Sequence, residues 1–210
     1  QALNFGVYFA DLAFASSFQE NALILGYFTT IKVLSDELGI SNALDAAIYE
    51  KVDVSLENDD SDSLLFLSND AYFQAYSYLE DNERGSTLAL IVLGGWIESL
   101  YIMTNLGQYE EGSNLVARIG EQKLTVGNLM GFMMKYQDDS NVAEVMEELA
   151  DIEELFWSFE EVEGDDVSTS QEGDVYVLSG GSTIIVSAEQ YEKLKELVSK
   201  LRNEIVEGEL

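Results

Sequence analysis

The feature of this sequence that most constrains its fold is a helical segment that occurs twice. The first copy, from Gly6 to Ser16, reads GVYFADLAFAS, and the second, 88 positions later from Gly94 to Thr104, reads GGWIESLYIMT. Residues of the same kind recur at corresponding positions: Gly6 and Gly94, Tyr8 and Trp96, Phe9 and Ile97, Leu12 and Leu100, Phe14 and Ile102, Ser16 and Thr104. This internal similarity predicts two related helical halves that bury a shared seam.

Periodicity and turn signals predict four helices in each half, joined by short connections. The expected helices are residues 4–17, 20–38, 41–56 and 63–79, and then 86–106, 109–120, 126–137 and 140–160. The chain contains no proline, which fits a mostly helical chain because proline ends helices. We therefore expect a mainly α protein, with two pseudo-repeated four-helix units that form a bundle or short helical stack.

The composition changes after residue 160. The acidic run EVEGDDVSTSQEGD predicts an exposed linker, and the run DVYVLSGGSTIIVS predicts a β-hairpin that turns at Gly180 and Gly181. Ser187 and Gln190 then form a capping-box pattern before a helix over residues 188–206. The expected organisation is a duplicated helical body over 1–160, an acidic linker over 161–172 and a C-terminal hairpin-helix appendage over 173–210.

The predicted hairpin has apolar residues on both faces, and a lone hairpin of this kind needs cover in water. The tail helix can cover one face. The other face must meet either the body or a second copy of the chain, so docking within the chain and a homodimer through the hairpin-helix both remain open.

Charge and composition exclude several functional classes. Forty acidic residues against ten basic ones give a formal net charge of −30, which argues against binding to nucleic acid or to anionic lipid surfaces. The chain also lacks histidine, the usual general base, and cysteine, the thiol nucleophile. Both residues are also preferred ligands of transition metals. We therefore expect no enzyme activity and no cofactor.

Two further patterns resemble known binding sites. Asp59, Asp60 and Asp62 resemble the start of an EF-hand loop, but the turn glycine and the closing glutamate are missing, so we expect a helix N-cap and no metal site. Gly94 and Gly95 lie inside a predicted helix rather than after a strand, which does not fit a phosphate loop. Their expected role is the close approach of two helices at the seam.

Residues 87–107 are almost long enough and apolar enough to cross a membrane. Glu98 lies in the middle of this stretch, however, and Gly94 and Gly95 interrupt it. We expect the central buried helix of a soluble domain and no transmembrane helix.

The polar positions of greatest interest are Asp11 and Glu98, because each lies among apolar residues of a predicted helix. A buried carboxylate must find hydrogen bonds or a cation, or take up a proton. The cations considered for this role are Arg84, Lys32 and Arg118. One interpretation is a structural network that ties the two halves together.

The alternative interpretation is a ligand cleft between the halves. Asp11 and Glu98 would form its floor, and Tyr8, Trp96 and Tyr101 would form its walls. Aromatic walls with two acids suit a sugar or a small cationic ligand. A glycosidase also needs two carboxylates, but the sequence does not fix their separation.

Three segments carry a family resemblance: GVYFADLAFASSF, LALIVLGGWIESLYI and SGGSTIIVSAEQYEKLKELVSKLRNEIV. They resemble an uncharacterised family of secreted or lipid-anchored helical proteins from Bacteroidetes-type bacteria. The resemblance implies a periplasmic or cell-envelope location reached through a signal peptide, and a chain that starts at Gln1 fits the removal of such a peptide. It supplies no active residues, and no cysteine is present for lipid attachment.

The sequence as a whole favours a non-catalytic binding or assembly protein of the bacterial cell envelope, with an unknown protein or small molecule as its partner. The alternative is a small-ligand receptor that uses the cleft between the helical repeats.

Overall fold

The computed structural model describes residues 1–44, 46–58, 60–163, 168–172, 175–179, 182–208 and 210. The expected mainly α fold is confirmed, because the described residues form eight α-helices and four short strands. The first four helices are α1 (Ala2–Ser17), α2 (Asn21–Glu37), α3 (Ala46–Glu57) and α4 (Ser61–Asp81). The others are α5 (Gly85–Asn105), α6 (Asn114–Met133), α7 (Ser140–Trp157) and α8 (Ala188–Glu207).

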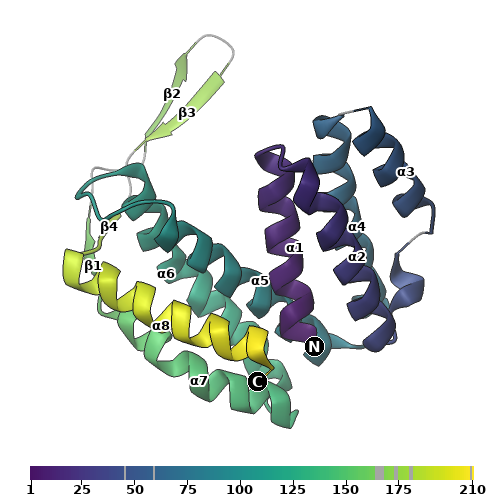
Figure 1. Ribbon diagram of the computed structural model, residues 1–210. Helices are drawn as coiled ribbons and strands as arrows, with labels where there is room; N and C mark the ends of the chain where they lie inside the picture. The colour runs from purple at the N-terminus through teal and green to yellow at the C-terminus, as the bar shows by residue number, and fades with distance from the viewer. Residues whose placement is uncertain (45, 59, 164–167, 173–174, 180–181, 209) are drawn as a thin grey trace.

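Helices α1 and α5 pack against each other at the centre of the molecule (Figure 1). On one side, α1 carries α2 and α4, and α3 packs on α4. On the other side, α5 carries α6 and α8, and α7 packs on both of these helices. The contact between α1 and α5 therefore joins the two groups of helices.

Glycines bring the backbones of α1 and α5 into contact. A Cβ atom added to Gly6 would overlap the carbonyl oxygen of Ile91, and one added to Gly94 would overlap the carbonyl oxygen of Leu3. The close helix approach predicted for Gly94 is thus confirmed, and Gly6 makes the reciprocal contact. No larger residue fits at either position unless the helices move apart.

Helix α5 is the one helix among the described residues that is long and apolar enough to span a membrane by length and composition. In this structure most of its length is buried within the protein. Core helices of soluble proteins have the same composition, so the location of α5 relative to a membrane stays a prediction.

The predicted helix starts are largely confirmed by their caps. Asp60 begins α4 and accepts a hydrogen bond from the Ser63 backbone N–H, which is the capping role expected for this acidic turn. Ser187 and Gln190 form the complete capping box of α8. Among the described residues there is no group of three or more acidic side chains placed to hold a metal ion.

Three predictions of helix extent were wrong. Residues 109–120 and 126–137 were expected as separate helices, but α6 runs unbroken through Gly120 and Gly127. These glycines serve packing, because Gly120 lies against Ile184 and Gly127 lies under the ring of Trp157. Residues 41–56 were expected as one helix, but a short 3₁₀ turn, η1 (Ser41–Ala43), precedes α3. A second such turn, η2 (Met134–Tyr136), extends α6, and α7 ends at Trp157 rather than at residue 160.

The strand pairing also differs from the prediction. The runs on either side of residues 180–181 were expected to pair with each other, but β3 (Val175–Ser179) pairs with β2 (Ser168–Glu172). In turn β4 (Thr183–Ile185) pairs with β1 (Glu160–Val162), and both pairs are antiparallel. The expected linker over 161–172 therefore contributes strands, and the expected turn at Gly180 and Gly181 lies outside the described residues. The β2–β3 pair projects away from the helices (Figure 1).

Helix α8 contributes a full apolar stripe to the core. Its residues Tyr191, Leu194, Val198, Leu201 and Ile205 are all buried. This stripe packs toward α5 and α7 of the same chain. The domain boundaries at residues 160 and 173 and the homodimer through the hairpin-helix stay predictions.

Candidate functional site

The structure brings Asp11 of α1 and Glu98 of α5 together. The two carboxyl groups lie close enough to share a hydrogen bond. Glu98 is 1% exposed, whereas Asp11 keeps some contact with solvent. The two acids, which the sequence places on separate helices, therefore meet where α1 packs on α5.

Their cation is Arg202, which comes from α8. The Nε atom of Arg202 donates to one carboxylate oxygen of Glu98 at 2.9 Å, and an Nη atom approaches the other at 3.5 Å. The guanidinium also lies over the ring of Tyr101, 4.8 Å from its centroid. Such a fork-shaped contact is the strong form of an arginine–carboxylate pair.

The three cations considered from the sequence lie elsewhere. Arg84 donates to the carbonyl oxygen of Leu38, Lys32 lies over the ring of Tyr49, and Arg118 pairs with Glu121 on the surface. Arg202 is separated from Glu98 by 104 positions in the sequence, so no local pattern connects them. The available signal was its place beside the buried Leu201 at the edge of the apolar stripe of α8.

The environment raises the pKa of Asp11 to about 7 from its ordinary value of 3.8. Burial is the main cause, the charge of Glu98 adds to it, and the charge of Arg202 opposes it. A hydrogen bond to Glu98 further favours the protonated form of Asp11. Near neutral pH this cluster therefore exchanges one proton with solvent.

The predicted aromatic walls are only partly present. Tyr101 covers Arg202, and Tyr8 lies 6.1 Å from Tyr27 of α2, measured between ring centroids. Burial raises the pKa of Tyr27, and the charges of Asp11 and Glu98 add to this rise. Sequence reasoning missed Tyr27, because it lies outside the repeated segments.

Trp96 does not join this cluster. Its indole N–H donates to Gln122, and its ring packs 5.9 Å from Phe156. Two positions apart on a helix means about 200° around the axis, so Trp96 and Glu98 leave α5 in nearly opposite directions. A cleft walled by Trp96 above the two acids is therefore not formed.

The carboxyl pair does not have the geometry of a glycosidase. Retaining enzymes hold their two carboxyl groups about 5 Å apart and inverting enzymes hold them farther apart. Here the two groups share a hydrogen bond, and Glu98 is buried and paired with Arg202. The arrangement can hold a proton and fasten three helices, which matches the structural network weighed from the sequence.

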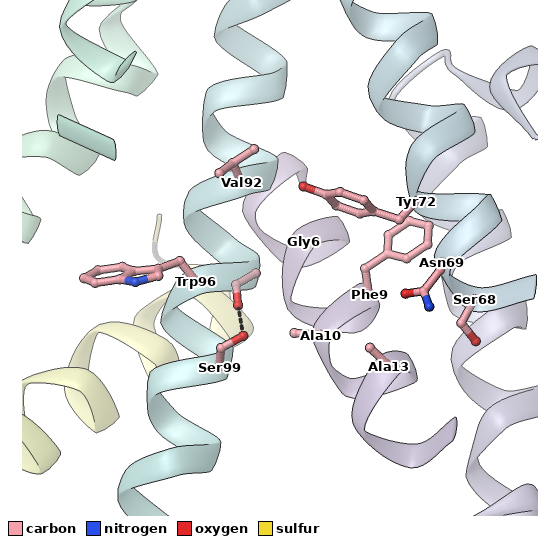
Figure 2. A pocket seen from close by; sticks show the side chains of 11 residues that line it. Gly6, Phe9, Ala10, Ala13, Ser68, Asn69, Tyr72, Val92, Trp96 and Ser99 are labelled. Carbon is pink, nitrogen blue, oxygen red and sulfur yellow. Dashed lines mark hydrogen bonds between the residues drawn. The ribbon is translucent and has the colours of Figure 1, made fainter. Parts of the chain in front are cut away.

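A separate hollow of about 290 Å³ lies between α1, α4 and α5 (Figure 2). Its walls are mostly small or aromatic residues at the crossing of the two central helices. They include Gly6, Phe9, Ala10 and Ala13 from α1, Asn69 and Tyr72 from α4, and Val92, Gly95 and Ser99 from α5. Only the part of Trp96 nearest the backbone borders the hollow, and Figure 2 shows its indole ring directed away from it.

Two polar groups at the hollow have no partner among the described residues. These are the side-chain amide of Asn69 and the hydroxyl of Tyr72, which lie one helical turn apart on α4. The hydroxyl of Ser99, in contrast, donates to the Gly95 carbonyl oxygen of its own helix at 2.7 Å. An apolar hollow with a few free polar groups is the usual form of a small-molecule site.

The raised pKa of Asp11 predicts how stability depends on pH. The unfolded chain loses this proton near pH 3.8 and the folded chain near pH 7, so stability falls as the pH rises through this interval and is level above it. We expect Asp11→Asn, which keeps a donor toward Glu98, to match the wild type at pH 4 and to be more stable at pH 8. The expected gain in unfolding free energy is about 1–2 kcal/mol. This is less than the pKa difference alone implies, because Asp11 is partly exposed.

Urea unfolding followed by circular dichroism at several pH values measures this effect. Asp53→Asn, which removes one exposed charge from α3, is the matched control and should show no comparable gain. Equal gains in the two variants would mean that general charge repulsion, rather than the carboxyl pair, governs the pH dependence.

Comparisons of this chain with models of protein families, with curated proteins and with solved structures find no match.

Proposed function

We propose that this protein is a non-catalytic binding protein of the bacterial cell envelope that holds a small ligand in the hollow between α1, α4 and α5. The observation that carries the proposal is the hollow itself, with the free side-chain amide of Asn69 and the free hydroxyl of Tyr72 beside an apolar floor. It is not the cleft expected from the sequence, because only Trp96 of the five residues expected there borders it. The two acids serve the fold instead.

We further propose that the two halves arose by duplication, as the repeated segment predicts. The offset of 88 positions relates Gly6 to Gly94 and Leu3 to Ile91. The contact of Gly6 with Ile91 then has its counterpart in the contact of Gly94 with Leu3. A local twofold relation between α1 and α5 accounts for this reciprocity.

The absence of histidine and cysteine supports the non-catalytic part of the proposal. The envelope location rests on the family resemblance alone, and fractionation of cells that express the complete precursor tests it. An assembly role through the hairpin-helix is the other proposal from the sequence, and light scattering at two salt concentrations tests it.

Thermal unfolding with small probes tests the ligand site. We expect at least one of methyl glucoside, choline and benzyl alcohol to raise the melting temperature of the wild type by two degrees or more at about 10 mM. Ala10→Leu, which places a larger side chain in the hollow, should remove that shift. Ala117→Leu on the exposed face of α6 should keep it.

The proposal fails if none of these probes stabilises the wild type. It fails equally if Ala10→Leu, shown to be folded by circular dichroism, responds as the wild type does.

A further inference from the structure

The hollow and the carboxyl cluster occupy corresponding places on the two sides of the α1–α5 crossing. The offset of 88 positions relates Ala10 to Glu98 and Asp11 to Ser99. The contact between Asp11 and Glu98 on the α8 side therefore corresponds to the neighbourhood of Ser99 and Ala10 on the α4 side. Both of these residues line the hollow.

The same offset relates Tyr101 to Ala13, which also lines the hollow. On the α8 side, the carboxylate of Glu98 and the phenol ring of Tyr101 fill the space beside the crossing. On the α4 side, both positions are alanine. The hollow thus lies where the side chains are shorter than at the positions related by the offset of 88.

The volume and the walls of the hollow indicate what kind of molecule it accepts. An apolar cavity of about 150 Å³ stays dry and accepts benzene, and this hollow measures about 290 Å³. The rings of Phe9 and Tyr72 border it edge to face, with centroids 5.6 Å apart. An aromatic guest can extend this edge-to-face arrangement, which stabilises ring pairs beyond the burial of their area.

The uncharged lining of the hollow restricts the charge of a molecule that binds there. None of the lining residues carries a formal charge. A charged guest would lose its hydration here without gaining an ion pair, which is unfavourable. A neutral guest with one hydroxyl or amide group can bond to Asn69, which reaches the exposed rim of the hollow.

We propose that the hollow binds a small uncharged aromatic molecule that carries one hydrogen-bonding group, in the place that Tyr101 holds on the other side. This inference rests on the proposed ligand-binding function and names the class of ligand. The guest's ring packs on Phe9 and Tyr72 above the small residues of the helix crossing. Its polar group faces Asn69.

Titration of the full ¹⁵N-labelled chain with four probes tests the inference. The probes are benzyl alcohol, cyclohexylmethanol of similar size and polarity, benzoate and methyl glucoside. We expect benzyl alcohol to shift the amide signals of Gly6, Ala10 and Gly95. We expect at least tenfold weaker binding of the other three probes.

Two variants test whether the aromatic molecule binds within the hollow. Ala13→Tyr restores the ring found on the other side and should abolish binding of benzyl alcohol, while Ala117→Tyr on the surface of α6 should leave it unchanged. Asn69→Leu should weaken benzyl alcohol more than tenfold but leave toluene unaffected, because toluene has no polar group. If Ala13→Tyr does not fold, Ala10→Leu replaces it.

The outcomes separate the two proposals. Binding of cyclohexylmethanol or methyl glucoside as tight as that of benzyl alcohol, abolished by Ala13→Tyr, overturns the aromatic class. Equally tight binding of benzoate overturns the uncharged class. Both results leave the hollow as a binding site. Binding of benzyl alcohol that survives both Ala13→Tyr and Ala10→Leu overturns the placement. Failure of all four probes to bind overturns this inference, and the proposed function falls with it only if choline also fails to raise the melting temperature.

Discussion

Gly94→Ala should cost about 3 kcal/mol of unfolding free energy, because its new Cβ atom would overlap the carbonyl oxygen of Leu3. The obstacle is backbone on both sides, so no side-chain rotation can relieve it. Gly6→Ala should cost a similar amount through the carbonyl oxygen of Ile91. Urea unfolding monitored by circular dichroism measures both variants.

Two other helical glycines provide matched controls. Gly26 of α2 and Gly131 of α6 have nothing within 4 Å of an added Cβ atom. Alanine is the better helix former, so Gly26→Ala and Gly131→Ala should stabilise the protein by about 0.5–1 kcal/mol. If Gly94→Ala behaves like these controls, the close approach of α1 and α5 is wrong.

Arg202→Met should cost about 2–4 kcal/mol, because Glu98 would stay buried without its cation. The lower part of the range reflects the partial exposure of Arg202, whose side chain is 23% exposed. Methionine keeps much of the aliphatic packing of arginine, so the loss reports mainly on the ion pair and on the contact with Tyr101. Chemical denaturation at pH 7 provides the measurement.

Lys193→Met on the same helix is the appropriate comparison. Lys193 pairs with Glu196 on the surface, where both side chains are mostly exposed, and such pairs contribute less than about 1 kcal/mol. Combining Arg202→Met with Glu98→Gln removes the buried charge and should recover at least half of the loss. A double variant as unstable as the single one would contradict the pairing.

The sequence predicted most helices because their apolar residues recur with helical periodicity, as in α1, α5 and α8. It assigned Gly94 correctly to a close approach of two helices but took Gly120 as the end of a helix, although Gly120 contacts β4. Only the three-dimensional surroundings distinguish Gly120 from a glycine that does end a helix, such as Gly39 with its φ of 65°.

The strand pairing was mispredicted for a related reason. A glycine pair between two β-branched runs is a strong local hairpin signal, yet Ile184 pairs with Glu161 and Val177 with Ser170. Pairing partners are chosen by packing as well as by the turn. Ile184 lies against Gly120 of α6, a contact between distant segments that no local pattern encodes.

For the site, the sequence correctly brought Asp11 and Glu98 together because both interrupt apolar helices. Trp96 could have been excluded in advance, since residues two apart on a helix do not share a face. Arg202 could not be identified, because its pairing depends on how α8 docks. The hollow could not be foreseen either, since alanines mark a space only when their surroundings are known.

The pairing of Glu98 with Arg202 also has a consequence for how the protein is made. A ribosome adds roughly 5–20 residues per second, so the 104 positions between the two residues take roughly 5–20 seconds to synthesise. During that interval α5 exists without the guanidinium that neutralises its buried carboxylate. The ion pair that joins α5 to α8 therefore forms only after α8 has left the ribosome.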